Sequence, residues 1–252
     1  MIKTNKLYHI GLSEDIQAKY ALLPGNPGRV EAIARHLESY EKIDSNREYL
    51  TYRGLLCGES ILVTSTGIGG ASSAIAVEEL YTLGVRNFIR IGTCGGMQPQ
   101  VEGGDIVIAT AAVRAEGTSR EYVPIEYPAV SDFEVTAALA SAAKKLNKPY
   151  HTGVVQSKDS FYGQHSPERM PVGYELESKW RAWIKAGCLA SEMECAAIYT
   201  VAGVLGAKSG AVLSVVWNQE RERLKLPNPE VHDAESAIAV AIDALKILIK
   251  GS

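Results

Sequence analysis

The sequence lacks the features that mark secreted and membrane-spanning proteins. No run of about 18 uninterrupted apolar residues is present, so we expect no membrane-spanning helix. Residues 1–9 contain no apolar core of a signal peptide. Neither a C-x-x-C pair nor a histidine-rich spacing accompanies the four cysteines, Cys57, Cys94, Cys188 and Cys195. We therefore expect buried, reduced thiols, no cysteine-ligated metal and a cytoplasmic protein.

An excess of positive charge is also missing. Lys and Arg total 26 against 29 Asp and Glu, a formal net charge of −3, which argues against a general affinity for nucleic acid or anionic membranes. The sequence contains no G-x-x-x-x-G-K-[ST] motif, and the glycines at 67–69 lack the last glycine of a dinucleotide fingerprint. A nucleoside-triphosphate P-loop and a dinucleotide oxidoreductase are thus disfavoured, and the expected partner is a different small molecule.

What is present is an alternation of apolar strands and helices. The chain has 252 residues with 46% hydrophobic content, enough for one substantial core, so we expect a single domain over 1–252. Apolar runs predict strands at 20–24, 61–66, 88–91, 105–112, 153–157 and 209–216. Helical periodicity is found at 29–37, 71–83, 132–146, 192–205 and 234–250. This order indicates an α/β sheet covered on both faces, with ligands at the carboxyl ends of its strands. Residues 167–185 are interpreted as an insertion or lid.

Two carboxylates stand where an apolar strand passes into an apolar helix. Glu192 and Glu194 flank Met193 within the segment 190–199. Carboxylates surrounded by apolar residues need fixed partners, and a ligand rich in hydroxyl groups would provide them. The alternative is that Glu194 only places negative charge in the first turn of the helix, where the backbone amides favour it. The local sequence leaves both interpretations open.

Glycine and arginine occur together at several strand ends. Gly25 and the glycines at 67–70 follow predicted strands, where backbone amides can approach an anion, although plain turn geometry is the alternative. Arg90 lies inside the apolar run 88–91, and a half-buried guanidinium there requires an anion such as phosphate. Arg29, Arg47 and Thr93 could complete such a site. A surface arginine in a salt bridge is the alternative, stronger for Arg47 than for Arg90.

A second cluster follows the predicted strand at 153–157. Phe161, Gln164 and Arg169 provide an aromatic face, an amide and a guanidinium, which suit a planar heterocycle with carbonyl and N–H groups. Taken alone they are ordinary loop residues. Beside an arginine-lined phosphate site and a carboxylate for sugar hydroxyls, they complete a pocket for a nucleoside and phosphate.

With these motifs, the chain resembles the nucleoside phosphorylase family of trimeric and hexameric enzymes. The resemblance covers nearly the whole length and rests on motifs in a fixed order: Tyr8-His9-Ile10-Gly11-Leu12, Pro24-Gly25-Asn26-Pro27-Gly28-Arg29-Val30, Ser65-Thr66-Gly67-Ile68-Gly69-Gly70, Val77-Glu78-Glu79-Leu80, Arg90-Ile91-Gly92-Thr93-Cys94-Gly95, Asp159-Ser160-Phe161-Tyr162 and Glu192-Met193-Glu194. It implies a three-layer α/β/α fold of the phosphorylase/hydrolase type with a central mixed, partly barrel-like sheet.

The resemblance also implies roles for individual residues. Those that match the phosphate site are Gly25, Arg29, Arg90, Thr93 and, from a neighbouring subunit, Arg47. Those that match the ribose site are Met193, Glu194 and a neighbour's His9. Those that match the base site are Phe161, Gln164, Arg169, Asn218 and Gly95. In some members Glu48, Ile68 and Ser72 match positions that hold a monovalent cation, here K⁺, between subunits.

Four positions separate this chain from patterns common in the family. Asn218 stands where the purine branch carries an aspartate that protonates the departing base, and an amide suits a pyrimidine anion better. Asn26 replaces the usual aspartate of the phosphate loop. Four residues separate Gln164 from Arg169, where one is common. Gln219 replaces a frequent arginine, for which Arg221 or Arg223 is a candidate substitute.

The expected activity is that of a pentosyltransferase. The resemblance implies reversible phosphorolysis of uridine to uracil and ribose 1-phosphate, with inorganic phosphate as co-substrate and no required cofactor, and with Arg90, Glu194 and Arg29 as the catalytic residues. The expected assembly is a homo-hexamer, a trimer of dimers. Two alternatives remain: a phosphorylase of the same family for purine or methylthio-nucleosides, and a catalytically weak nucleoside-binding protein.

Overall fold

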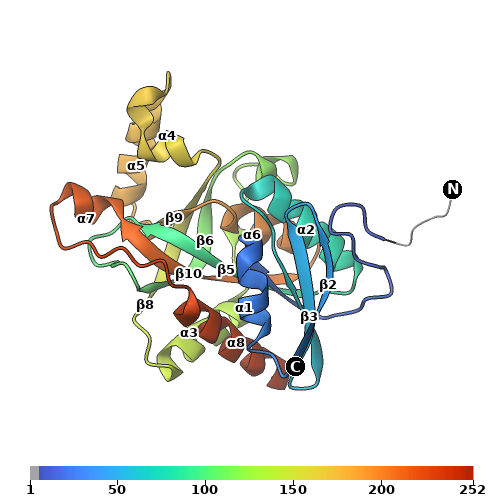
Figure 1. The fold of residues 1–252 in the computed structure, drawn as a ribbon. Coiled ribbons are helices and arrows are strands. Elements are labelled where there is room, and N and C mark those ends of the chain that lie inside the picture. Colours follow the sequence, from blue (N-terminus) through green and yellow to red (C-terminus); the bar gives the residue numbers. More distant parts are fainter. Residues whose placement is uncertain (1–5, 252) are drawn as a thin grey trace.

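A mixed ten-stranded sheet runs through residues 6–251, the part of the chain that the computed structural model describes (Figure 1). Residues 1–5, the first part of the N-terminal stretch discussed above, and residue 252 lie outside it. The strands are β1 Tyr20–Pro24, β2 Ser39–Asn46, β3 Tyr49–Leu56, β4 Glu59–Thr64, β5 Asn87–Gly96, β6 Ile106–Ala115, β7 Ala129–Val130, β8 Tyr150–Lys158, β9 Ala190–Glu192 and β10 Lys208–Asn218.

Helices separate most of these strands. The α-helices are α1 Val30–Ala34, α2 Gly70–Thr82, α3 Phe133–Lys145, α4 Phe161–His165, α5 Gly173–Lys185, α6 Cys195–Val204, α7 Gln219–Arg223 and α8 Glu235–Lys250. Short 3₁₀ helices are η1 Pro27–Arg29, η2 Thr118–Glu121 and η3 Pro167–Arg169. Every helix expected from periodicity is present, although the one expected at 29–37 is divided into η1 and α1.

The sheet closes on itself over part of its width. Its strand order is β10-β6-β8-β9-β5-β1-β4-β3-β2, and β10 also pairs with β5, so that β5, β10, β6, β8 and β9 form a ring. β1, β4, β3 and β2 extend this ring as an open sheet, and β7 pairs with β6 of the ring. The expected α/β fold with a mixed, partly barrel-like sheet is therefore confirmed.

Side-chain alternation along the strands explains the two helical layers. In β1, Ala21 and Leu23 belong to one buried cluster with residues of α2 and α6, whereas Tyr20 and Leu22 belong to a second cluster with residues of α1, α3 and α8. Successive side chains of a strand point to opposite faces, so a strand that is apolar throughout must be covered twice. The continuous apolar runs in the sequence have this physical origin.

The structure adds elements that the sequence did not predict. β5 continues through Gly96, beyond the strand expected at 88–91, because residues 92–96 pair with β10 and its end pairs with β9. β2 and β3 form a hairpin whose turn carries Arg47 at a φ of +54°. The segment interpreted as an insertion or lid contains η3 and α5, and α4 and α5 stand away from the body of the molecule (Figure 1).

The structure bears on two expectations, the burial of the cysteines and the absence of a membrane-spanning helix. Cys94, Cys188 and Cys195 are buried free thiols as expected, but Cys57 is exposed, which corrects the expectation that all four are buried. Among the described residues, none of the helices combines the length and the apolar character needed to cross a bilayer.

Candidate active site

Two glycine loops lie side by side at the carboxyl ends of β1 and β4. These strands are parallel neighbours, and the amide of Gly67 donates a hydrogen bond of 3.0 Å to the carbonyl of Gly25. A Cβ atom on Gly25 would lie 3.1 Å from the Gly67 carbonyl oxygen, so a larger residue would push the loops apart. The side chain of Asn26 accepts the amide of Gly28 at 2.8 Å and caps η1, a bond that an aspartate could equally make. Asn26 therefore preserves the local shape of the loop.

Arg90 extends from β5 into the buried space beside these loops, with only 3% of the residue exposed. Its Nε donates to the Glu192 carboxylate at 3.1 Å, and its Nη2 pairs with Glu194. Nη1 has no hydrogen-bond partner among the described residues. Burial alone would lower the pKa of Arg90, but the carboxylates of Glu194 and Glu192 outweigh it and raise the pKa above its usual range. The site thus contains a charged guanidinium with an unused donor.

Arg29 lies close enough to Arg90 for the two charges to repel. Arg29 ends η1 after the Gly25 loop and is half-buried. Burial, and then the charge of Arg90, lower the pKa of Arg29. An anion between two such guanidinium groups would relieve the repulsion and bind both in fork geometry. Thr93, half-buried on β5 and opposite Ser214 of β10, keeps its role at phosphate as a prediction.

Glu192 and Glu194 differ in their surroundings, although both contact Arg90. The Glu192 side chain is fully buried and accepts the amides of Glu194 and Cys195 at 2.8 and 2.9 Å, as well as the hydroxyl of Ser157. It fixes the turn from β9 into α6. Glu194 accepts the amide of Gly69 at 2.6 Å, and burial is the main cause that raises its pKa. Glu194 therefore joins the glycine loop to Arg90, and its role exceeds that of a first-turn charge.

A polar network on β8, β9 and α4 lies next to this acid turn. The Nζ of Lys158 donates to the Ser191 hydroxyl at 2.7 Å, and Ser191 lies 2.6 Å from Oε1 of both Gln156 and Gln164. The amide of Gln164 also donates to Gln219 at 3.2 Å. Amide donors and acceptors beside a buried ammonium can bind a heterocycle that carries carbonyl and N–H groups.

Phe161 and Gly95 border the same network. The Phe161 ring centroid lies 5.9 Å from the Nζ of Lys158, and the His165 ring is 4.3 Å from that of Phe161. Gly95 pairs with Ser191 across β5 and β9. Phe161, Gln164 and Gly95, which the sequence suggested for the base, are therefore gathered at one end of the site.

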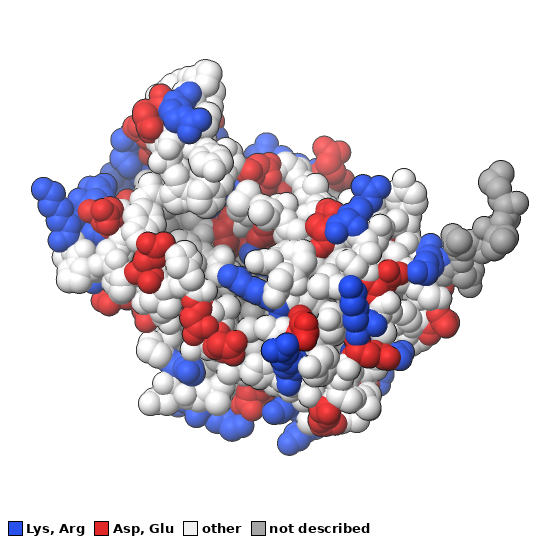
Figure 2. Space-filling view, in the orientation of Figure 1, with Lys and Arg blue, Asp and Glu red and all other residues white. Residues whose placement is uncertain are grey.

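A cavity of about 1240 Å³ opens from this end beneath the projecting α4–α5 segment; Figure 2 shows the hollow there. Lys158, Gln164 and Gln219 line it, and so does Trp180 of α5. Ligand pockets usually enclose roughly 300–1,000 Å³, so the cavity has room for a base, although Arg90 and Glu194 do not line it. The indole N–H of Trp180 donates to Glu220 of α7 at 2.9 Å, which holds α5 against the body of the molecule.

Asn218 does not contribute to this cavity, which corrects the expectation that it binds the base. Asn218 is completely buried. Its amide nitrogen donates to the carbonyls of Gln98 and Val101 at 2.8 and 2.7 Å. Its oxygen accepts the amides of Glu220 and Arg221 at 2.8 and 3.0 Å and caps α7. Because both donors and both lone pairs of the amide are used, Asn218 has no group left for a ligand.

The arginines considered for the base end are exposed or engaged by other groups. Arg169 is exposed on η3 and does not line the cavity. Arg221 donates to the carbonyls of Pro227 and Pro99 and pairs with Glu102. Arg223 lines the cavity, but its side chain is mostly exposed and pairs with Glu220.

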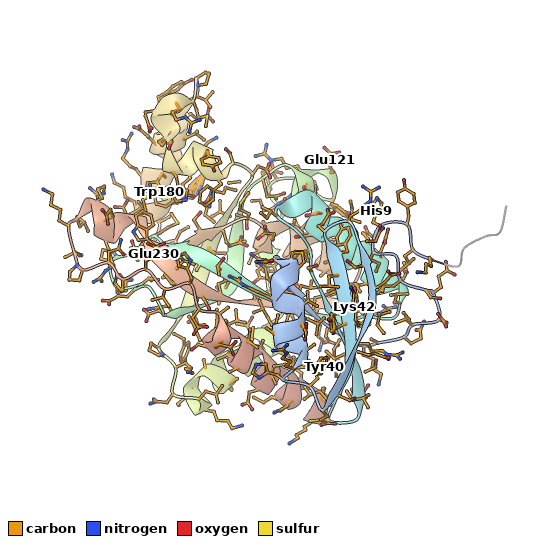
Figure 3. The ribbon with its side chains drawn as sticks, viewed as in Figure 1. His9, Tyr40, Lys42, Glu121, Trp180 and Glu230 are labelled. Atoms are coloured by element: carbon orange, nitrogen blue, oxygen red, sulfur yellow. The ribbon has the colours of Figure 1, made fainter. Side chains whose placement is uncertain are left out.

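His9 and Arg47 lie on another side of the molecule. In Figure 3, His9 lies far from Trp180 of α5. The Nδ1 of His9 is 2.6 Å from the Glu79 carboxylate, which fixes the imidazole. Arg47 is exposed at the tip of the β2–β3 hairpin, with its guanidinium 6.0 Å from the Tyr8 ring. No hydrogen bond or ion pair within residues 6–251 joins either residue to Arg90, so their roles at the site remain predictions.

Glu48, Ile68 and Ser72 surround the second glycine loop. A Cβ atom on Gly67 would lie 2.8 Å from Cγ of Glu48 and 3.3 Å from Oγ of Ser72. The Ser72 hydroxyl lies 3.3 Å from the Ile68 carbonyl oxygen. A carboxylate, a carbonyl and a hydroxyl side by side are oxygen donors that suit a hard cation.

Sequence reasoning missed Lys158, Ser191 and Gln156. Lys158 directly follows the strand expected at 153–157, and Ser191 directly precedes Glu192. Both positions lie at strand ends near candidate site residues, and this placement could have identified them from the sequence. The contact between Lys158 and Ser191 could not be inferred, because it depends on the parallel pairing of β8 with β9.

The fold and the gathered groups define an enzyme-like site with an arginine-containing end, a carboxylate centre and an amide-lined end. Over residues 19–249 the chain matches the phosphorylase superfamily. The protein belongs to this superfamily.

Named relatives cover almost the whole chain. It is 54% identical over 242 residues to uridine phosphorylase of Treponema pallidum (strain Nichols), covering 96% of this chain and 94% of that protein. It is 40% identical to uridine phosphorylase of Escherichia coli (strain K12), covering 96% and 98% of the two chains. It is also 36% identical to guanosine phosphorylase of Halorubrum lacusprofundi (strain ATCC 49239 / DSM 5036 / JCM 8891 / ACAM 34), covering 95% and 98%.

Proposed function

We propose that the protein is a pentosyltransferase that catalyses the reversible phosphorolysis of uridine to uracil and ribose 1-phosphate. The observation that carries the proposal is the buried guanidinium of Arg90, which pairs with Glu194 and keeps Nη1 without a partner among the described residues. One residue thereby touches the acid suited to sugar hydroxyls and keeps a donor for an anion. The names of the two uridine phosphorylases support uridine as the substrate.

Phosphate would bind between Arg90, Arg29 and the Gly25 loop. Two neighbouring guanidinium groups and backbone amides neutralise the anion and aim one of its oxygens at the anomeric carbon. Thr93 adds a hydroxyl at this end. The protein need not supply a covalent nucleophile, because phosphate itself attacks and catalysis follows from positioning and preorganised charge.

Ribose would lie across Met193 and Glu194. The Glu194 carboxylate is held by the amide of Gly69 and by Arg90, so its oxygens are fixed before a sugar hydroxyl arrives. A carboxylate that accepts the 2′ and 3′ hydroxyls also favours the positive charge that develops on the ring as the glycosidic bond breaks. His9 of a neighbouring copy would reach the 5′ hydroxyl.

Uracil would lie at the cavity end, against Phe161 and Gln164 with Gly95 beneath. Gln164 and Gln219 offer both amide donors and acceptors, which suit a base with alternating carbonyl and N–H groups. The side-chain oxygen of Asn218 already accepts hydrogen bonds that cap α7, so Asn218 neither favours a pyrimidine base nor opposes a purine base. Arg169 is not assigned to the base.

A purine nucleoside is the second candidate substrate. Two observations favour it: the 36% identity to a guanosine phosphorylase, and a cavity of about 1240 Å³ that has room for a bicyclic base. The two substrates differ in the base alone, so the phosphate and ribose assignments are the same for both.

Assembly and ion binding complete the proposal. The half-buried His9 and the exposed Arg47 suit donation to the site of another copy, as in a homo-hexamer built from three dimers. Glu48, the Ile68 carbonyl and Ser72 would hold a monovalent cation such as K⁺ beside the second glycine loop. No catalytic step is assigned to that cation, and none is assigned to an organic cofactor.

The experiment is a product assay with and without inorganic phosphate. Purified protein is incubated with uridine, thymidine, inosine, guanosine and methylthioadenosine, and free base and sugar phosphate are separated by chromatography. We expect uracil and ribose 1-phosphate from uridine only when phosphate is present. Uracil released without phosphate would indicate a hydrolase, and a faster reaction with guanosine or inosine would shift the assignment to purines. Nucleoside binding without any product would indicate a binding protein.

A further inference from the structure

Lys158 is a buried ammonium at the end of the site assigned to the base. It is the last residue of β8, and 7% of the residue is exposed. Its Nζ makes one hydrogen bond among the described residues, to Ser191, although an ammonium group has three donors. No carboxylate lies within ion-pair distance of Nζ among residues 6–251. A buried charge with donors to spare calls for a partner, and Lys158 lines the cavity where one can enter.

Other cations near the cavity are already engaged or exposed. Arg114 gives its donors to Ser119 and to the carbonyls of the 119–127 loop, as at Pro124 and Tyr127. Arg221 donates to loop carbonyls and pairs with Glu102. Arg223 pairs with Glu220 at the surface. Lys158 differs because it is buried with donors that have no partner among the described residues, and because it shares Ser191 with Gln164.

We propose that Lys158 stabilises the departing base anion by donating a hydrogen bond from Nζ to a carbonyl oxygen of the base. The inference rests on the proposed phosphorolysis. As the glycosidic bond breaks, its electron pair goes to the base nitrogen while a phosphate oxygen forms the new bond to the anomeric carbon. The negative charge spreads onto the carbonyl oxygens of the base, and a preorganised cation there stabilises the transition state. The proton stays on Lys158, and the released anion takes its proton from water.

Lys158 then provides the charge that Gln219 cannot. Gln219 is neutral and lies one hydrogen bond beyond Gln164. Lys158 reaches the same amide from the opposite side, through Ser191. The ring of Phe161, 5.9 Å from Nζ, covers the ammonium and limits its access to water. The base site thus contains a cation that comes from β8 instead of from the segment after β10.

The ionisation of Lys158 gives this assignment a pH signature. Burial lowers its pKa to about 8, although Glu192, Glu194 and Cys94 act to raise it. His165 of α4 also faces it, and the Lys158 charge contributes to the lowered pKa of that imidazole. Lys158 holds its proton below pH 8 and loses it above, so its contribution to turnover declines as the pH rises through about 8.

The test compares Lys158→Met and Lys158→Arg with the wild-type protein and with Lys179→Met. Lys179 lines the same cavity, but its side chain is exposed and pairs with Glu175, so that variant controls for charge removal alone. The substrates are uridine and 5-fluorouridine, whose base is the better leaving group. We expect Lys158→Met to lower kcat for uridine by roughly 10²–10³-fold, the usual loss of a charge-stabilising donor, and to lower it less for 5-fluorouridine. The KM for phosphate and the activity of Lys179→Met should be unchanged.

Lys158→Arg provides a second readout if the methionine variant folds poorly. An arginine stays protonated at all accessible pH, so this variant should keep more activity than Lys158→Met and lose the decline near pH 8. Equal losses on both nucleosides, or a raised KM for phosphate with the leaving-group dependence unchanged, would overturn the assignment. So would the wild-type pH profile in Lys158→Arg. A wild-type protein that releases no uracil in the presence of phosphate would instead refute the proposed phosphorolysis.

Discussion

The Arg90 guanidinium and the Glu194 carboxylate are in direct contact, through Nη2 and Oε2. They come from elements that are far apart in the chain, β5 and the turn from β9 into α6, and both side chains are buried. The contact joins the proposed phosphate and ribose positions at one point. A sugar hydroxyl that binds Glu194 competes with Arg90 for the same carboxylate, and this leaves the arginine freer to bind phosphate. Binding of the two substrates should therefore be coupled.

Replacing Arg90 by alanine should abolish most of the activity. The expected loss of transition-state stabilisation is about 3–4 kcal/mol, by analogy with other deleted charge-stabilising donors. The substitution also leaves Glu192 and Glu194 buried without their cation, which should destabilise the fold by about 3–5 kcal/mol. Steady-state kinetics in phosphate and urea unfolding measure the two effects. Arg90→Lys, which keeps the charge but loses the fork, is the control, and an unchanged dependence on phosphate would refute the role of Arg90.

Replacing Glu194 by glutamine should weaken the use of the ribose hydroxyls. An amide cannot accept hydrogen bonds with both of its polar atoms, so kcat/KM for uridine should decrease. We expect a smaller decrease for 2′-deoxyuridine, because that substrate lacks one of the hydroxyls that the carboxylate would accept. The measurement is the ratio of kcat/KM for the two nucleosides. An equal decrease for both would place Glu194 away from the 2′ hydroxyl.

Replacing Gly25 by alanine should raise the KM for phosphate. The new Cβ would lie 3.1 Å from the Gly67 carbonyl oxygen, and the two glycine loops would have to separate by a few tenths of an ångström. Gly203→Ala is a matched control, because a Cβ there meets nothing within 4 Å. That control should leave the KM for phosphate unchanged and should not lower the unfolding temperature. The same KM in both variants would show that the loop separation does not matter.

The fold could be predicted from the sequence because its apolar runs follow local rules. The strand at 20–24 coincides with β1, and the strand and helix periods predict the two-sided packing that the buried clusters show. The end of β5 was missed because its glycines are typical of a loop. They are extended because β10 and β9 pair with them, and the sequence does not reveal those partners.

The site was partly predictable for the same reason. Arg90 and Glu194 were identified because each is a charge in an apolar segment, and an apolar segment becomes the core. Asn218 was assigned to the base because it matches a family position, whereas its hydrogen bonds to Gln98 and Val101 are tertiary contacts that the sequence does not reveal. Lys158 was missed because a lysine at a strand end is usually exposed, and only the packing of β8 against β9 buries it.

Burial of Lys158 should cost stability at neutral pH. Its pKa is about 8 in the folded chain and 10.5 ordinarily, so the unfolded chain binds the proton more tightly. The stability of the wild-type protein should decline as the pH falls from 10.5 through 8, by about 3 kcal/mol in all. Lys158→Met lacks this dependence. It should unfold at a higher urea concentration than the wild type at pH 7 and at a similar one near pH 10.5, whereas Lys179→Met should track the wild type throughout. A constant difference across that pH range would contradict the buried charge.

Mixing two inactive variants should restore activity if Arg47 serves the site of a neighbouring copy. In a pair made of one Arg47→Ala chain and one Arg90→Ala chain, one site receives Arg90 from the first and Arg47 from the second, and the other site lacks both. Random pairing in equal amounts should recover about a quarter of the wild-type activity, because half of the pairs are mixed and each has one intact site. Co-expression with two affinity tags and a uridine assay measure this. Arg90→Ala with Glu194→Gln is the control: these residues contact each other within one chain, so no mixed pair regains a complete site. If the first mixture also recovers nothing, Arg47 does not complete a neighbour's site.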